Sequence, residues 1–89
     1  MNITYDPAKE IINIAKHGVS LGLAVELEWD TLWVKQDGRR NYGEVRMIGY
    51  ALISDRVYVV VFTDRGDVRR IISLRKANPR EVRFYANNH

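Results

Sequence analysis

Three runs of strand-forming residues, separated by very short polar turns, constrain this chain more than any other feature. The runs cover residues 45–53, 57–63 and 68–74, and they are rich in Val, Ile, Leu and Tyr. Turns this short can join only antiparallel neighbours. The sequence therefore predicts an antiparallel sheet, with the most apolar run, 57–63, as its central strand.

A helix is expected over residues 7–17, before these strands. Asp6 can cap its free N–H groups, and Pro7 suits the first helical position. Gly18 can adopt the left-handed conformation that ends a helix. An apolar stripe recurs at helical spacing, formed by Ala8, Ile11, Ile12 and Ala15.

Weaker patterns complete the predicted fold. Ser20 is a candidate cap for a second short helix over 21–28, residues 31–35 indicate a further strand, and a final short helix is expected over 79–87. With helices gathered at the chain ends, the predicted class is α+β: a small, twisted, mainly antiparallel sheet with two N-terminal helices and a short C-terminal helix. We expect residues 1–89 to form a single domain.

The composition restricts the compartment in which such a protein acts and the kind of partner that it binds. The chain has 89 residues and no cysteine, which favours a reducing cytoplasm over secretion. It has no apolar run near the ~20 residues of a membrane span and no signal-peptide pattern. Of its 14 basic residues, ten are arginines and twelve follow residue 34. Arginine matches phosphate geometry, which favours a polyanionic partner.

The charged residues near the strands are of the kinds that metal-free RNA cleavage uses. That reaction needs a base for the 2′-hydroxyl proton, cations for the phosphorane charge and an acid for the leaving oxygen. Glu44 or His17 could be the base. The candidate phosphate-binding arginines are Arg46, Arg65, Arg70 and Arg75. Further RNA contacts are expected from Lys16, Arg69 and Lys76, while no residue pattern indicates a metal or another cofactor.

Strand alternation places some of these cations together. One face of 68–76 should carry Arg69, Ile71, Ser73 and Arg75. The opposite face should carry Arg70, Ile72, Leu74 and Lys76. Glu44 and Arg46 should share a face of their own strand.

Each functional interpretation has a structural alternative. His17 could simply be the cation at a helix C-terminus, and Glu44 with Arg46 an exposed ion pair. Trp29 and Trp33 are better explained as core anchors than as base-stacking surfaces. A non-catalytic nucleic-acid-binding module could use the same basic face, and so could an interaction protein with an acidic partner.

Several segments together resemble a known family. They are Tyr5-Asp6-Pro7-Ala8-Lys9, Asn13-Ile14-Ala15-Lys16-His17-Gly18-Val19-Ser20, Gly43-Glu44-Val45-Arg46, Val59-Val60-Val61-Phe62-Thr63-Asp64-Arg65-Gly66, Arg70-Ile71-Ile72-Ser73-Leu74-Arg75-Lys76-Ala77, then Glu81 and Tyr85. They resemble the BrnT ribonuclease toxins of the type II toxin–antitoxin system BrnT/BrnA, over nearly the whole chain. Segment 29–43 departs from the family pattern.

This resemblance implies a RelE-like fold and RNA cleavage that inhibits translation. It also implies a cognate BrnA-like antitoxin that neutralises the toxin and carries a DNA-binding domain. In that family two toxins and two antitoxins assemble, and the complex binds operator DNA through the antitoxin. No membrane partner is implied.

Overall fold

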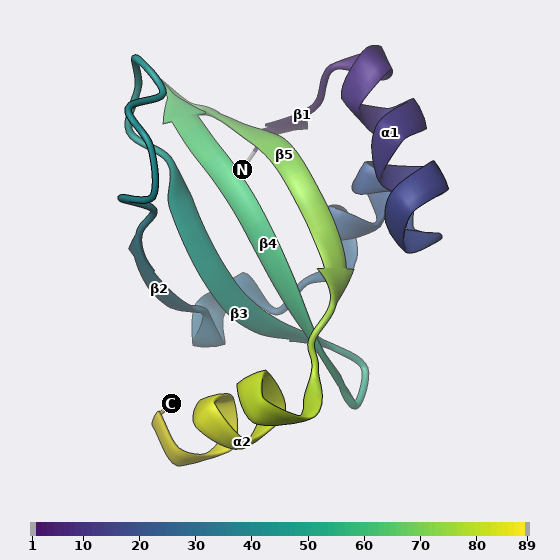
Figure 1. Ribbon diagram of the computed structural model, residues 1–89, viewed down its shortest axis with the longest axis vertical. Helices are drawn as coiled ribbons and strands as arrows, with labels where there is room; N and C mark the ends of the chain where they lie inside the picture. The colour runs from purple at the N-terminus through teal and green to yellow at the C-terminus, as the bar shows by residue number, and fades with distance from the viewer. Residues whose placement is uncertain (1, 89) are drawn as a thin grey trace.

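The computed structural model describes residues 2–88 and has an α+β architecture built on one five-stranded sheet (Figure 1). The strands lie in the order β1-β5-β4-β3-β2. In chain order the elements are β1 (Asn2–Thr4), α1 (Pro7–His17), the 3₁₀ helices η1 (Leu21–Glu26) and η2 (Trp29–Thr31), β2 (Trp33–Gln36), β3 (Met47–Ile53), β4 (Arg56–Arg65), β5 (Val68–Lys76) and α2 (Pro79–Asn88).

Strand β4 lies at the centre of the sheet, as predicted. It pairs antiparallel with β3 on one side and with β5 on the other. All residues from 57 to 63 are buried. Strand β2 pairs antiparallel with β3 and begins at Trp33, because η2 takes up the residues before it.

Strand β1 was not predicted. It pairs in parallel with β5, from Asn2 opposite Val68 to Thr4 opposite Arg70. Three residues are too few to produce a recognisable alternation, and the partner strand is remote in sequence. The sheet is therefore mixed, with antiparallel pairing everywhere except at this edge.

Helix α1 has the predicted bounds but not a buried apolar stripe. Asp6 accepts a hydrogen bond from the N–H of Ala8 at 2.8 Å, and Gly18 ends the helix at a φ of 69°. However, Ile11 and Ile12 are 70% and 62% exposed. The helix instead buries Asn13 against the sheet. Local capping thus determines where the helix begins and ends, whereas tertiary contacts determine which side of it is buried.

The second short helix expected over 21–28 forms as the 3₁₀ helix η1, which ends at Glu26 and is followed by η2. Leu21, Ala24 and Leu27 recur every three residues and are all buried. A 3₁₀ helix has three residues per turn, so it aligns such residues on one side. The predicted cap is confirmed, since the Ser20 hydroxyl accepts the N–H of Gly22 at 3.1 Å.

The sheet has two different faces. The covered face lies under η1 and η2, behind the sheet in Figure 1, and its sheet residues include Tyr58, Val60, Phe62, Ile71 and Leu74. The pocket face, toward the viewer, carries Ile48, Val59, Val61, Ser73 and Arg75. Helix α2 covers one end of the pocket face, where Tyr85 packs with Val57 and Val59.

A β-bulge in β5 changes which cations share a face. Val61 pairs with Ser73 and Phe62 pairs with Ile71, so Ile72 is an extra residue in the register. A bulge interrupts the alternation of side chains. Arg69 consequently joins Ile71 on the covered face, where it stacks on Phe62, whereas Arg75 is on the pocket face. The predicted grouping of Arg69 with Arg75, and of Leu74 with Ile72, is therefore wrong.

Candidate active site

A pocket of about 470 Å³ lies on the pocket face between α1 and the sheet. Its floor is apolar and is formed by Ile48, Val59 and Val61. Its rim is basic, and consists of Lys9, Lys16, His17, Arg39 and Arg75. Because the rim contributes cations and an imidazole, the pocket suits a ligand that carries negative charge.

Asn13 fixes α1 to the edge of β5. Its side-chain nitrogen donates to the carbonyls of Leu74 and Val19, both at 2.8 Å. Its side-chain oxygen accepts the N–H of Leu74 at 3.2 Å. The Asn13 side-chain amide thus forms hydrogen bonds with backbone groups of β5 at a part of its edge where β1 does not pair with it. It also holds the last turn of α1, with Lys16 and His17, at the pocket.

His17 is the histidine of this pocket, and its pKa is lowered. Partial burial lowers the pKa of its imidazole, and the nearby positive charges of Lys16 and Arg75 lower it further. The neutral imidazole is therefore favoured at neutral pH. A neutral imidazole at the rim of a cationic pocket can accept a proton from a bound hydroxyl group.

Arg75 is held rigidly at the rim. Its guanidinium donates two hydrogen bonds to the Glu81 carboxylate, at 2.8 Å each. This pairing lowers the pKa of Glu81 and raises that of Arg75. The Arg75 side chain is still one-third exposed, so a ligand in the pocket can reach it. A cation oriented before the ligand arrives loses less side-chain entropy on binding.

The other predicted base lies in a separate cluster. Glu44 accepts a hydrogen bond from Arg65 at 2.9 Å, and the Arg46 Nε lies 3.7 Å from its carboxylate. Arg65, and then Arg46, lower the pKa of Glu44. None of these three residues lines the pocket of His17 and Arg75. Such pairing stabilises a carboxylate as an anion and makes it a weaker base.

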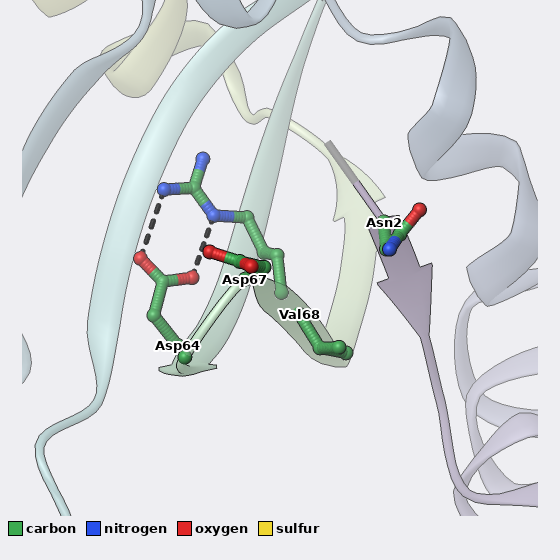
Figure 2. A pocket seen from close by; sticks show the side chains of 6 residues that line it. Asn2, Asp64, Asp67 and Val68 are labelled. Carbon is green, nitrogen blue, oxygen red and sulfur yellow. Dashed lines mark hydrogen bonds and ion pairs between the residues drawn. The ribbon is translucent and has the colours of Figure 1, made fainter.

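The remaining predicted RNA contacts also lie outside the pocket. Arg69 donates two hydrogen bonds to Asp64, at 2.8 and 3.0 Å, in a depression that Asn2 and Asp67 also line (Figure 2). That depression carries two carboxylates and an arginine already paired, which makes it a poor phosphate site. Arg70 lies 3.7 Å from Asp6, and Lys76 is exposed at the end of β5.

The structure thus brings together three of the predicted site residues, Lys16, His17 and Arg75. It adds Lys9, Asn13 and Arg39, which sequence analysis missed. Asn13 could have been noticed in the sequence because it is a polar residue between two apolar ones, Ile12 and Ile14. Trp29 and Trp33 pack against the two apolar clusters, which confirms them as core anchors.

Two further properties describe the chain over residues 2–88. No group of three or more His, Asp or Glu side chains there is placed to hold a metal ion. No helix in the same range has the length and apolarity needed to cross a membrane.

Fold and pocket together define a class: a small α+β protein with a basic, histidine-containing pocket on one sheet face. A family model described as the ribonuclease toxin BrnT of type II toxin–antitoxin systems matches residues 5–81. The chain belongs to this family, which confirms the resemblance found in its motifs. Membership of a type II system implies a protein antitoxin as partner. A comparison with curated proteins finds no match.

Proposed function

We propose that this chain is an endoribonuclease toxin that cleaves RNA by metal-independent acid/base chemistry and so inhibits translation. The observation that carries the proposal is the meeting of His17, Lys16 and Arg75 around one pocket. An imidazole, an ammonium group and an oriented guanidinium are the groups that cleavage beside a 2′-hydroxyl requires. Because the rim is cationic, it attracts a phosphodiester and repels a metal ion.

In the proposed reaction, the 2′-oxygen attacks the adjacent phosphorus and the bond from phosphorus to the 5′-oxygen breaks. Neutral His17 accepts the 2′-hydroxyl proton. Arg75 stabilises the negative charge that grows on the non-bridging oxygens. An ammonium group of the rim, Lys16 or Lys9, gives a proton to the departing 5′-oxygen. The products are a 2′,3′-cyclic phosphate and a 5′-hydroxyl end.

The cations outside the pocket have a supporting role in this proposal. Arg65, Arg69 and Arg70 are each close to a carboxylate. We assign them, with Arg46 and the exposed Lys76, to the positive field that attracts RNA. Glu44 is kept as the alternative base, and the comparison of Glu44 and His17 variants below decides between them.

We further infer that the chain has a RelE-like fold and acts in the cytoplasm. Its partner would be a BrnA-like antitoxin that neutralises it. Two toxins and two antitoxins would assemble, and the complex would bind operator DNA through the antitoxin. These inferences rest on membership of the BrnT family.

The decisive test is cleavage of a mixed RNA by the purified protein in excess chelator. We expect cleavage that leaves 2′,3′-cyclic phosphate ends, and its loss in His17→Ala. Activity that vanishes in chelator and returns with Mg²⁺ would contradict the metal-independent mechanism. Binding without any cleavage would favour the second candidate function, a non-catalytic nucleic-acid-binding module using the same basic pocket.

A further inference from the structure

A second basic depression lies in the loop between β2 and β3. Its volume is about 390 Å³, and its lining residues are Arg39, Arg40, Tyr42 and Arg46. Three guanidinium groups therefore line it, with one aromatic ring and no carboxylate. No part of the function proposed above uses Arg40 or Tyr42.

The loop is held in shape by Asp37, whose side chain is only 2% exposed. Its carboxylate accepts hydrogen bonds from the Arg39 Nε at 2.8 Å, the Arg39 Nη2 at 2.7 Å and the Tyr42 hydroxyl at 3.3 Å. The Asp37 N–H donates to the carbonyl of Arg46 at 2.7 Å. The Arg39 side chain lowers the pKa of Asp37 to about 2, so the carboxylate stays ionised.

Arg46 and Tyr42 form a stacked pair in this loop. The guanidinium carbon of Arg46 lies 4.0 Å from the centroid of the Tyr42 ring. A guanidinium on an aromatic ring offers a flat surface, and RNA-binding proteins use such surfaces to stack unpaired bases. Within residues 2–88, Arg40 has no ion pair, so its charge remains available to a ligand.

Arg39 connects this depression to the pocket of His17. It lines both of them. Its positive charge also acts on the guanidinium of Arg75, whose pKa it lowers against the larger effect of Glu81. One side chain therefore spans the distance between the two sites, and a single strand of phosphodiesters could contact both.

We propose that Arg39, Arg40, Tyr42 and Arg46 form a second substrate subsite for single-stranded RNA, which binds a phosphate and base flanking the cleaved phosphodiester. This proposal rests on the proposed ribonuclease function. Phosphate suits the site better than a protein carboxylate does, because three arginines line it beside a stacking surface that can also hold a base.

Arg40→Ala tests the subsite, because Arg40 is exposed and its loss should not disturb the fold. Arg56→Ala is the matched control, an exposed arginine at the start of β4, at the opposite end of the sheet from this loop (Figure 1). Cleavage should be measured on an oligonucleotide and on a dinucleoside monophosphate, which has no second phosphate. Affinity should be measured on a 2′-O-methyl oligonucleotide, which cannot be cleaved.

For Arg40→Ala we expect the oligonucleotide KM and the 2′-O-methyl Kd to rise roughly threefold to tenfold, with a salt slope smaller by about one. The kcat, and cleavage of the dinucleoside monophosphate, should match wild type, as should every value for Arg56→Ala.

Unchanged oligonucleotide affinity and salt slope would overturn the subsite. So would a loss of affinity for the antitoxin alone, which would make the loop a protein-binding surface. If wild type cuts no RNA, the ribonuclease proposal fails, and the 2′-O-methyl measurement still decides whether Arg40 binds RNA.

Discussion

Arg75 and Glu81 form a two-point ion pair across the turn between β5 and α2, with both hydrogen bonds at 2.8 Å. The same carboxylate accepts the N–H of Asn78 at 2.9 Å, and the Asn78 side chain accepts the N–H of Glu81 at 2.9 Å. This reciprocal cap begins α2. A single carboxylate therefore starts the helix and orients the arginine of the pocket.

Arg75→Ala should remove a cation that acts on charge growing in the transition state. We expect cleavage to slow by ~10²-fold or more, the scale seen when an oxyanion donor is deleted. RNA affinity should fall much less, since only one phosphate contact is lost. Cleavage, affinity and melting should be compared with Arg83→Ala, an exposed arginine on α2. A folded Arg75→Ala protein that cuts RNA at the wild-type rate would remove Arg75 from the site.

Asn13→Leu should destabilise the protein although the substitution adds apolar surface. It leaves the Leu74 N–H and two carbonyls without their partner, and unsatisfied buried groups cost ~1–3 kcal/mol each. Ile11→Ala, on the same helix but 70% exposed, should change stability by less than ~0.5 kcal/mol. Chemical denaturation measures both, and equal effects would show that Asn13 is not the anchor of α1.

Val60→Asp should be among the most damaging single substitutions in β4. Val60 is fully buried on the covered face, so the carboxylate would have no partner and should cost several kcal/mol. Val61→Asp should cost less, because Val61 lies on the floor of the basic pocket. Thermal melts of the two variants check this order. A cooperatively melting Val60→Asp protein near wild-type stability would contradict the packing of the covered face.

Much of the fold followed from local sequence signals. Asp6 and Gly18 mark the ends of α1 whatever surrounds it, and short turns force β3, β4 and β5 into antiparallel pairs. The features that sequence analysis missed depend on distant contacts. Strand β1 exists because β5 offers an open edge, and η1 is a 3₁₀ helix because the covered face buries every third residue.

In the candidate site, too, some features follow from local sequence and others depend on distant contacts. His17 and Arg75 could be named from residue type, yet nothing local indicated that α1 would place them together. The bulge at Ile72 moved Arg69 to the covered face, because one extra residue reverses the alternation along β5. Arg39 belongs to a loop with no periodicity, and only its shared position in two depressions revealed its place.

The pH dependence should report the lowered pKa of His17. Its neutral form is the proposed base, so the rate should rise with pH through that pKa and reach half its plateau below pH ~6.5, the ordinary value. Lys16→Met removes one positive charge that lowers this pKa, so the pKa should rise. NMR titration of the imidazole in a His89→Gln background, which leaves one histidine, measures the pKa of His17 with and without Lys16→Met. A wild-type pKa at or above 6.5, or no upward shift in Lys16→Met, would contradict this electrostatic picture.

Comparing His17→Ala with Glu44→Gln decides which group is the base. A general base contributes ~10²- to 10⁴-fold, so His17→Ala should lose activity on that scale while still binding 2′-O-methyl RNA. Glu44→Gln should keep its kcat, because Glu44 is paired with Arg65 and lies outside the pocket. Its RNA affinity should rise slightly, since a negative charge near the basic surface is removed. Cleavage, affinity and melting should be measured at one salt concentration. If Glu44→Gln loses kcat while His17→Ala keeps it, and both proteins fold, the base lies in the Glu44 cluster and the pocket of His17 only binds RNA.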